Sequence, residues 1–576
     1  MKLRVDKNKN GTMNLYVHKG YRDKNGKSTS KIVEKLGTYD ELLKEHDDPI
    51  AWAKEYVAKL NEQEKEANRK VVVSFDPTKR VDFDTSPLFN CGYIFLQKIY
   101  HELRLDRICK EISEEYKFQY DLDDILSRLI YGRILFPSSK LNTLEESKTL
   151  LEQPSFELHD IYRALDVLAE KADYIQAEVY KNSLKLGKRN AGILYYDCTN
   201  YYFEMEQADG LKQYGVSKEH RPNPIVEMGM FMDGDGLPLA YCLHAGNTNE
   251  QTTLVPLEKE ILEKYGREKF IVCTDAGLSS YDSRKFNNRD GRAFVTVQSL
   301  KKMLPHQKKF ALSPEKWHLP GEKETFTMED ILKDEEGNYS KTYYKEEWFN
   351  DNGIDQRFIV TFSLKYRDYL RALRENDIAR ANKLIENGSV SKTRQTDARR
   401  LIKKESFSSD DGSVADKHVF TIDTEKIQKE EMYDGFYCVA TNLEDSVEEI
   451  IRINARRWEI EESFRIMKSD FRARPVYLSN DERIKAHFLT CYLALVIYRY
   501  LEKRLEEKFT VSEITCTLKN MKLLAIEGEG YIPAYAPNNI TDALHETFGF
   551  RTDYQINTTR MMKKVLSDSK KYTKKG

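Results

Sequence analysis

The stretch GILYYDCT, residues 192–199, marks the point where the character of the chain changes. Upstream of it apolar residues recur with a helical period, whereas Ile193 to Tyr196 form a short β-rich run that ends in Asp197. The next expected elements are strands at 226–232 and 237–244, a helix at 253–265, and strands at 270–274 and 292–297. The turn between the first two of these strands is Asp233-Gly234-Asp235-Gly236. Three antiparallel strands followed by alternating helix and strand predict a mixed α/β sheet.

Upstream of this sheet the sequence predicts a basic N-terminal segment and then an α-helical domain. Asn10-Gly11 and Asn25-Gly26 are turn dipeptides typical of β-hairpins, and Lys and Arg are spread through the same segment. Residues 50–70 have the pattern of a polar helix, with Glu and Lys three to four positions apart. From about Ser86 the period is helical, and prolines divide the run into several helices.

Downstream of residue 300 the alternation of helix and strand is interrupted. This charge-rich region has possible strands at 358–362 and 418–422 and a helix at 365–387, and we expect an inserted subdomain. A strand at 435–442 and long helices at 446–469 and 481–508 follow, and the basic tail from about 550 is expected to be frayed. The expected divisions are 1–85, hairpin and helix; 86–190, helical; 191–299, core; 300–432, insertion; 433–510, core; and 511–576, C-terminal region.

Composition indicates a soluble, multidomain protein. Apolar residues make up 40% of the 576 positions and charged residues 32%, enough to bury a core. The net charge of −2 is no sign of nucleic-acid binding, so any affinity for DNA must come from local basic clusters. The eight cysteines form no C-x-x-C pair and are typical of small core residues in a reducing compartment. With no apolar leader and no run of about 20 apolar residues, we expect a cytoplasmic protein without membrane contacts.

Two aspartates are the first candidates for chemistry. Asp197 and Asp275 each follow an apolar strand, and strand ends in α/β sheets often display catalytic groups. Two neighbouring carboxylates repel each other unless a cation lies between them, and Mg²⁺ prefers such oxygen ligands. The alternative is that each aspartate caps the turn or helix that follows it.

The third candidate lies in the segment RRWEIEESFRIMK, residues 456–468. On a helix, Arg457, Glu461, Arg465 and Lys468 fall on one side because they are spaced four, four and three positions apart. A solvated face with ion pairs between turns would explain these charges. It does not explain why a tryptophan and a phenylalanine are embedded in so dense a charged run.

These motifs resemble the signature of bacterial insertion-sequence DDE transposases of the Y-R-E-K branch, the insertion-sequence-four group. Arg457, Glu461 and Lys468 match the Arg, Glu and Lys of that signature position by position, whereas Asn454 stands where its Tyr is expected. The segments that resemble the family's two Asp motifs and the strands between them are Asp197-Cys198-Thr199, Gly215 to Lys218, Gly246 to Thr248 and Thr274 to Leu278. The resemblance covers about residues 190–500, and the start of the N-terminal hairpin is also similar. It implies that DNA is bound by the N-terminal region 1–190, with 86–190 as a DNA-binding domain, and it makes 511–576 a candidate for DNA or dimer contacts.

The resemblance implies an RNase H-like core with a β-containing insertion before the third acid, and a DNA transposase that cuts element ends and joins them to target DNA. Asp197, Asp275 and Glu461 would hold two Mg²⁺ or Mn²⁺ ions roughly 3.5–4 Å apart. Arg457 and Lys468 would hold phosphates near the cut. In the family, the Tyr helps to hold a flipped base while a DNA hairpin forms. Because Asn454 replaces that Tyr, the sequence does not decide whether this protein forms a hairpin intermediate.

Several further residues have two interpretations each. Arg465, Lys218 and Arg221 are candidate contacts to backbone phosphate, with a solvated loop or helix face as the alternative. Trp317 and Trp348 could stack on a base, but local packing of the insertion is the favoured interpretation.

The transposase hypothesis predicts a homodimer in the complex with double-stranded DNA, because two terminal inverted repeats must be joined to one target. The first alternative is a DNA-binding protein that derives from a transposase and has an inactive catalytic site. The second is a standalone RNase H-like nuclease. The presence of all three acids disfavours the first alternative.

Overall fold

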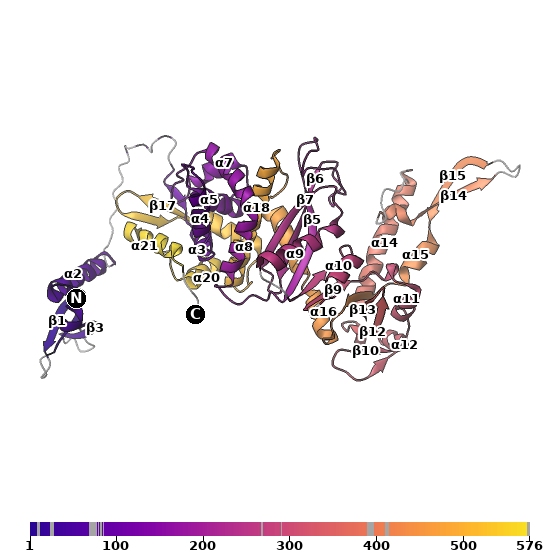
Figure 1. Cartoon of the computed structure of the whole chain (residues 1–576), viewed down its shortest axis with the longest axis horizontal. Coiled ribbons are helices and arrows are strands. Elements are labelled where there is room, and N and C mark those ends of the chain that lie inside the picture. The colour runs from indigo at the N-terminus through magenta and orange to yellow at the C-terminus, as the bar shows by residue number, and fades with distance from the viewer. Residues whose placement is uncertain are drawn as a thin grey trace. The chain divides into compact units, whose positions relative to one another are not determined.

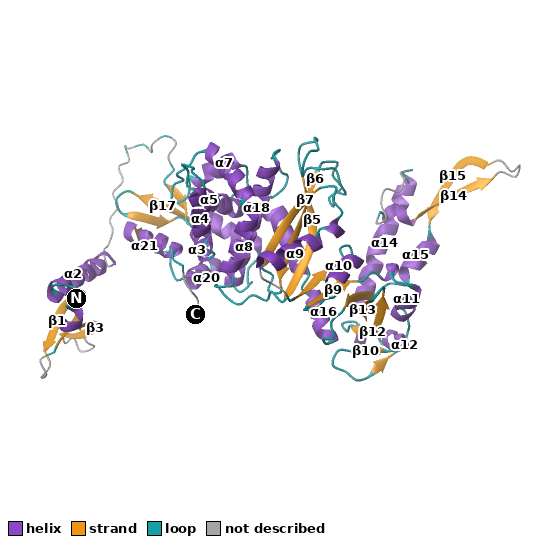
Figure 2. Cartoon of the chain, viewed as in Figure 1, coloured by secondary structure: helices purple, strands orange, loops and turns teal. Residues whose placement is uncertain are grey.

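The computed structural model describes residues 1–7, 12–22, 28–67, 78, 80, 83, 86–265, 269–289, 291–388, 397–408 and 414–572. The chain divides into two compact units, Met1–Thr85 and Ser86–Gly576. Figure 1 follows the chain by colour, and Figure 2 shows which segments are helix and which are strand.

The N-terminal unit is a three-stranded antiparallel sheet with helices on one face. Its elements are β1 (Lys2–Lys7), β2 (Met13–Arg22), β3 (Ser28–Thr38), α1 (Tyr39–Leu42) and α2 (Pro49–Ala67). The strand order is β1-β2-β3, and Leu15 and Val17 of β2 are fully buried. The expected turns at Asn10-Gly11 and Asn25-Gly26 lie outside the described residues.

The second unit begins with a helical layer. Its elements are β4 (Leu88–Asn90), α3 (Tyr93–Glu102), α4 (Leu105–Glu115), α5 (Leu122–Leu135), α6 (Lys140–Ser147), α7 (Leu158–Glu170) and α8 (Ala172–Ser183). Helices α3 and α5 are buried on nearly every side. A helix that is apolar all round needs cover from every direction, and here part of that cover comes from residues far along the chain.

A ten-stranded mixed sheet follows, in the order β11-β10-β12-β13-β16-β9-β8-β5-β6-β7. Its first half comprises β5 (Ile193–Tyr202), β6 (Ile225–Asp233), β7 (Pro238–Ala245), β8 (Phe270–Thr274) and β9 (Arg292–Val297). Strands β5, β6 and β7 are antiparallel neighbours, whereas β8 runs parallel to β5 and β9 parallel to β8. The helices between these strands are η1 (Glu250–Thr252), α9 (Leu254–Tyr265) and α10 (Tyr281–Phe286).

The expectation that residues 300–432 would fold apart from the main sheet is wrong for most of their strands. Strands β10 (Trp317–His318), β11 (Thr325–Phe326), β12 (Tyr343–Asp351) and β13 (Ile354–Phe362) extend that sheet. The link is β16 (Phe436–Thr441), which pairs with β13 on one side and β9 on the other. The apolar run in β16 is buried on both faces, so it fills a central position in the sheet.

The same region also carries helices and one separate ribbon. The helices are η2 (Leu300–Lys302), α11 (Pro305–Ala311), α12 (Met328–Lys333), α13 (Glu335–Asn338), α14 (Leu364–Glu386), η3 (Ala398–Leu401) and α15 (Thr424–Glu431). Strands β14 (Ile402–Ser408) and β15 (Val414–Ile422) form a two-stranded sheet of their own, which projects beyond α14 and α15 in Figure 1.

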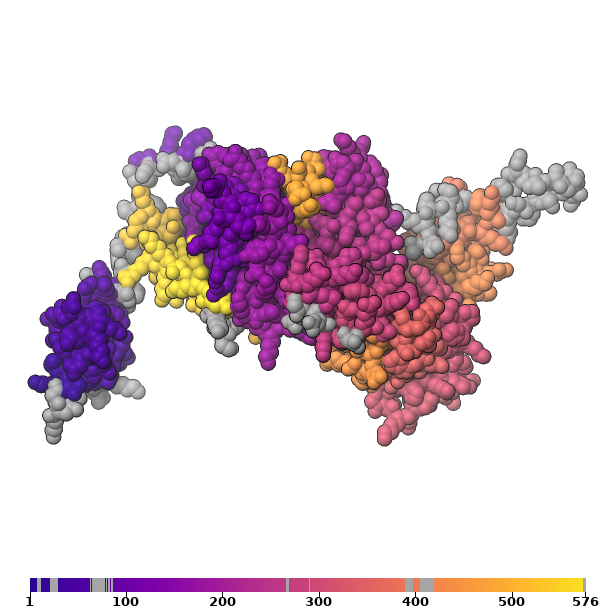
Figure 3. Space-filling model, in the orientation of Figure 1, coloured from indigo at the N-terminus to yellow at the C-terminus, as the bar shows by residue number. Residues whose placement is uncertain are grey.

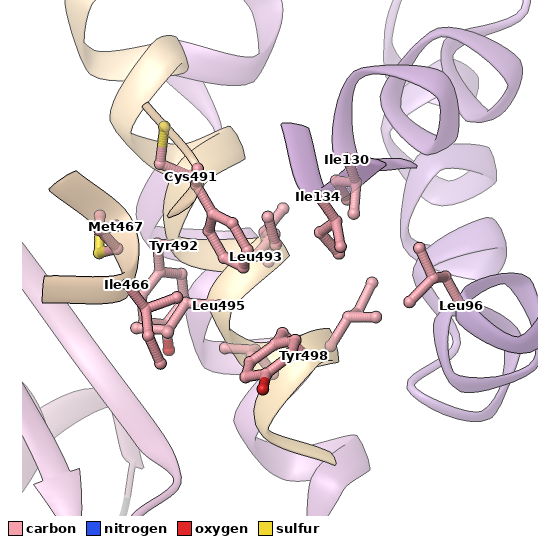
Figure 4. Packing of buried hydrophobic residues seen from close by; sticks show 14 of the residues in the cluster. Leu96, Ile130, Ile134, Ile466, Met467, Cys491, Tyr492, Leu493, Leu495 and Tyr498 are labelled. Carbon is pink, nitrogen blue, oxygen red and sulfur yellow. The ribbon is translucent and has the colours of Figure 1, made fainter. Parts of the chain in front are cut away.

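Helix α18 (Asp481–Arg504) is the central element of the large core. It packs against α3, α5 and α7 and against strand β7. Figure 4 shows Tyr492 and Leu495 of α18 near Ile466, while Ile130 and Ile134 of α5 approach α18 from the other side. The helix therefore joins the helical layer to the sheet.

The C-terminal region is ordered in a way that the sequence did not predict. It forms α19 (Val511–Asn520), β17 (Lys522–Ile526), β18 (Gly530–Pro533), α20 (Asn539–Phe548), β19 (Asn557–Thr558) and α21 (Thr559–Lys570). The expectation of a frayed tail is wrong, because Met562 and Val565 of α21 are buried and the helix packs on α3. Strand β17 pairs with β4, and in Figure 3 the yellow C-terminal surface lies beside the purple helical layer.

The cysteines agree with the expectation that most of them are small core residues. Of the eight cysteines, six are buried, Cys242 is half-buried and Cys516 is exposed. Across the described ranges, no helix combines the length and the apolar character needed to cross a membrane.

A buried acid in α9 gives a prediction about stability. Glu258 is fully buried and accepts a hydrogen bond from Asn287 Nδ2 at 2.8 Å, and burial raises the pKa of its carboxyl to about 8. The unfolded chain ionises Glu258 near its ordinary value, so the stability contributed by the neutral form falls as pH rises through this interval. Glu258→Gln should therefore raise Tm by a few degrees at about pH 8 and less at about pH 5.

Thermal unfolding of the two proteins at both pH values measures this difference. Glu263→Gln, an exposed change on the same helix, is the matched control and should leave Tm unchanged at both. An equal effect of Glu258→Gln at the two pH values would contradict the prediction.

Candidate active site

The two aspartates are brought together by the parallel pairing of β5 and β8. In that register Ile193 faces Ile271 and Tyr195 faces Cys273, so two residues further on Asp197 comes beside Asp275. Asp197 lies in the middle of β5 and not at its end as expected, because the strand continues to Tyr202 along β6. The apolar run Ile193–Tyr196 predicts a strand that ends at Asp197, but the residues after Asp197 continue β5 because they pair with β6.

Asp275 also caps the turn after β8. Its Oδ1 accepts hydrogen bonds from the backbone N–H of Gly277 at 3.0 Å and of Leu278 at 2.9 Å. Oδ1 of Asp197 accepts one from Cys198 N–H at 2.8 Å. The capping interpretation is thus correct for Asp275, and it orients the carboxylate without using Oδ2 in these bonds.

The electrostatics of Asp197 reflect its crowded position. Burial raises the pKa of this carboxyl to about 6, the positive charge of Lys218 opposes that rise, and the negative charge of Asp275 adds to it. Two carboxylates at adjacent positions of neighbouring strands therefore disfavour each other's ionised form. A cation between them would remove this cost.

Glu461 lies on a short helix and not on the long helix expected over 446–469. The chain forms α16 (Val447–Ala455), bends at residues 456–457, and continues as α17 (Trp458–Arg465) and a π-helical turn η4 (Ile466–Asp470). Arg457, at the bend, donates to Glu461 Oε1 at 3.2 Å, one turn further along. The Glu461 side chain is 58% exposed.

Helix α17 is fixed to the core from its far side. Arg499 of α18 donates to Ser463 Oγ at 2.8 Å and to the Glu459 carbonyl at 3.3 Å. Ile460 and Phe464 are buried beneath the helix. The exposed face that carries Glu461 is therefore held in position by buried contacts on the opposite face.

An open pocket of about 320 Å³ joins the elements of the site. Its lining residues are Asp197, Cys198, Thr199, Lys218, Glu461, Phe464, Arg465, Lys468, Ser469 and Arg474. Asp197 and Glu461 thus face one cavity, although 264 positions separate them in the sequence. Asp275 adjoins Asp197 but does not line this pocket.

The structure separates the predicted basic residues into two groups. Lys218 and Lys468 stand close to the carboxylates: Lys218 Nζ donates to the Cys198 carbonyl at 2.5 Å and pairs with Glu250 at 2.8 Å. Lys468 lies on η4, where burial and the charge of Lys218 lower the pKa of its amine to about 8. The Lys468 amine is therefore partly shielded from water and lies beside the pocket that Asp197 and Glu461 line.

Arg465 and Arg221 are engaged elsewhere. Arg465 lines the pocket, but its guanidinium pairs with Glu462 at 2.6 Å and with Asp470 at 3.2 Å. Arg221 is exposed and stacks over the Tyr202 ring at 4.3 Å. These two arginines lie at the margin of the site rather than at the carboxylates.

Further charged residues near the pocket were not predicted from the sequence. Glu227 of β6 is buried, accepts from Asn200 Nδ2 at 3.2 Å, and has a pKa raised to about 7 by burial and by the charge of Glu250. Glu219 pairs with Arg474 and, at 3.5 Å, with Lys468. Strand alternation flags Glu227 as a charged residue in an otherwise apolar run, VEMGMFM, and that was the one available signal.

Asn454, which stands where the family signature has a Tyr, also has a defined contact. Its Nδ2 donates to the phenol oxygen of Tyr437 on β16 at 3.1 Å, so a tyrosine from another part of the chain adjoins this position. Of the two insertion tryptophans, Trp317 is fully buried and Trp348 is 48% exposed. The packing interpretation holds for Trp317.

A metal site is not assembled by the side chains as they stand. Within the described part of the chain, no group of three His, Cys, Asp or Glu side chains is close enough to hold one ion. Asp197 and Asp275 offer the adjacent oxygen donors that a hard divalent cation takes. Glu461 faces the same pocket from α17 but is engaged by Arg457.

Comparison with known families identifies this arrangement. Residues 203–497, just over half of the chain, match the family model described as the transposase DDE domain. The chain belongs to this family and is a DDE transposase. The matched segment contains Asp275 and Glu461 and begins six positions after Asp197.

Two further comparisons complete the picture. No curated protein matches the sequence. Among solved structures, the cryo-EM structure of a piggyBac transposase synaptic complex with hairpin DNA is similar, with 9% sequence identity and a TM-score of 0.35, over 83% of this chain and 84% of that one.

The adjacency of the aspartates can be tested by titration. Asp275→Asn removes the negative charge beside Asp197, so the pKa of Asp197 should fall below its value of about 6. Carbon-13 NMR of aspartate-labelled protein measures the midpoint. Asp282→Asn, an exposed change in α10, should leave it unchanged. A midpoint of Asp197 that is the same in both variants would show that the two carboxylates are not neighbours.

Proposed function

We propose that this transposase cuts DNA at the ends of an insertion sequence and joins the freed ends to target DNA, using Asp197, Asp275 and Glu461. The observation that carries the proposal is that Asp197 on β5 lies near Asp275, which directly follows the parallel strand β8, with Glu461 facing the pocket of Asp197. No nucleophilic Ser or Tyr is required, because water and a 3′-OH are the attacking groups.

The strand order supports an RNase H-like core. Taken in chain order, the first five strands of the sheet lie as third, second, first, fourth and fifth, with the first three antiparallel and the last two parallel to the first. Asp197 belongs to the first strand and Asp275 directly follows the fourth, and these two strands are central neighbours. The third acid then comes from a helix that packs on the same sheet.

Divalent metal ions, which we propose to be two Mg²⁺ or Mn²⁺, would activate the attacking oxygen and stabilise the leaving one. Asp197, Asp275 and Glu461 would hold these ions. For this, Glu461 must exchange its contact with Arg457 for the metal, and the freed guanidinium can then turn to a DNA phosphate. An exposed ion pair of this kind is worth only about 0–1 kcal/mol, so the exchange costs little.

The remaining roles follow from charge and position. In the first step a water oxygen bonds to phosphorus and the bond from phosphorus to the 3′ oxygen breaks, which frees a 3′-OH. In the second step that 3′-OH attacks a target phosphate and a target 3′ oxygen leaves. Arg457 would hold a phosphate with a forked contact, and Lys218 and Lys468 would bind as point charges.

The proposal is tested with purified protein, flanking DNA and Mg²⁺. Asp197→Ala and Glu461→Gln should each lower cleavage by at least about a hundredfold, since each removes a metal ligand. Glu449→Gln is the matched control, because it removes one charge from the preceding helix α16, where Glu449 pairs with Arg452 and neither residue lines the pocket. Sizing of the DNA products measures the rate.

Cleavage that persists in Asp197→Ala would show that the site lies elsewhere. A wild-type protein that binds end DNA but never cuts it would instead favour a DNA-binding protein derived from a transposase. Cleavage without joining would favour a nuclease.

We also propose that the working form is a homodimer on DNA. Two element ends must be joined to one target, and a two-fold arrangement supplies two related active sites. The mass of the complex with end DNA should correspond to two chains and two ends. A complex of one chain and one end that completes strand transfer would rule the dimer out.

A further inference from the structure

The N-terminal unit has an uneven distribution of charge that the active site does not use. Residues 1–40, a segment that contains the three strands, include ten lysines and arginines against four acidic residues. Residues 41–67, which form the helices, contain four against eight. In a chain with a net charge of −2, the segment that contains the strands is therefore distinctly basic.

The pleat of β2 defines which side chains share each face of the sheet. Leu15 and Val17 are fully buried, and the next residue on their side, Lys19, pairs with Glu64 of α2. Helix α2 also reaches the opposite partner of Val17, since Tyr56 donates to Glu34 at 3.1 Å. Helix α2 thus covers the face of Leu15 and Val17, which leaves Tyr16 and His18 on the other face.

Residues directly opposite one another on antiparallel strands point to the same side. Tyr16 stands between Arg4 of β1 and Lys35 of β3, and His18 faces Lys2. The outer face, defined by Lys2, Arg4, Tyr16, His18 and Lys35, therefore has basic residues on both edge strands and aromatic rings along its middle. The three basic residues are exposed.

The face carries one opposing charge. Asp6 pairs with Arg4 at 2.8 Å, and both side chains are largely exposed. An exposed pair of this kind is weak and exchanges readily for a phosphate. The local balance of charge on the outer face remains positive.

We propose that this outer face is a binding surface for duplex DNA, seated in the major groove. Three strands about 4.8 Å apart span about 10 Å, and the major groove of B-DNA is about 12 Å wide. Basic residues on both edge strands would then meet the phosphates on the two sides of the groove, with Tyr16 and His18 toward its floor. Duplex RNA offers no such surface, because its major groove is deep and narrow.

The inference rests on the proposed function and deepens it, since it names a surface for DNA on a different unit from the one that carries the cutting residues. It differs from that function in what it requires. Binding at this face needs neither metal nor carboxylates, so it can be tested with protein that carries Asp197→Ala.

The experiment compares full-length variants in binding to a duplex of about 30 base pairs over a range of salt concentrations. Lys2→Gln, Arg4→Gln and Lys35→Gln together should lower affinity at least tenfold and reduce the salt slope by about 2–3, because each lost phosphate contact releases about one counterion fewer. Lys44→Gln, Lys54→Gln and Lys59→Gln together are the control. They remove the same charge from exposed positions on the helical side of the unit.

A second variant separates groove contact from simple charge attraction. Tyr16→Ala should weaken binding while leaving the salt slope unchanged, since it removes no charge. Circular dichroism and thermal unfolding check that each variant is folded. A duplex RNA of the same length should bind no worse to the triple variant than to the control.

Two results would overturn the inference: a triple variant that loses no more affinity than the control variant, or an equal loss of affinity for DNA and for RNA. These outcomes are distinct from failure of the proposed function. If the triple variant loses DNA binding but wild-type protein never cuts DNA, the DNA-binding surface is supported and the proposed transposition activity is contradicted. If cleavage is intact and the triple variant binds normally, only the surface assignment falls.

Discussion

Burial of α18 on all sides is the constraint on which the second unit depends. A helix with no polar face must be covered from every direction, and α3, α5, α7 and the edge of the sheet provide that cover. Each buried large apolar side chain contributes about 1.5–3 kcal/mol. The polar groups of α18 connect it outward: Tyr492 donates to the Leu239 carbonyl of β7, and Arg499 to the backbone and side chain of α17. The position of Glu461 is therefore set by the same packing that joins the helical layer to the sheet.

The sheet contributes a second constraint, which concerns charge. Parallel pairing of β5 and β8 brings Asp197 close to Asp275, which follows directly after the end of β8, and the charge of Asp275 raises the pKa of Asp197. Lys218 and Lys468 offset part of the repulsion between the two carboxylates without contacting both acids. Holding these like charges close together lowers the free energy of unfolding, as is common where a cation completes a site.

The sequence predicted the parts of this molecule whose signals are local. Strands 270–274 and 292–297 agree residue for residue with β8 and β9, because short apolar runs between turns leave little choice of boundary. The expected helix over 446–469 is broken, since the chain must bend at residues 456–457 to present Glu461, and no proline or glycine marks that bend. Long-range pairing was invisible as well: nothing in residues 343–362 shows that β12 and β13 will join a sheet whose linking strand, β16, begins at Phe436.

The late position of β16 has a consequence during synthesis on the ribosome. Strand β9 ends at Val297, and the strand that covers its open edge begins 139 positions later, at Phe436. At ordinary elongation rates of 5–20 residues per second the nascent chain leaves that edge uncovered for roughly 7–30 s. An uncovered β edge recruits other strands, so this interval is when the chain is most exposed to aggregation and most dependent on chaperones. The same high contact order implies that the core sheet closes late and slowly, after the excursion through α14 and the β14–β15 ribbon is complete.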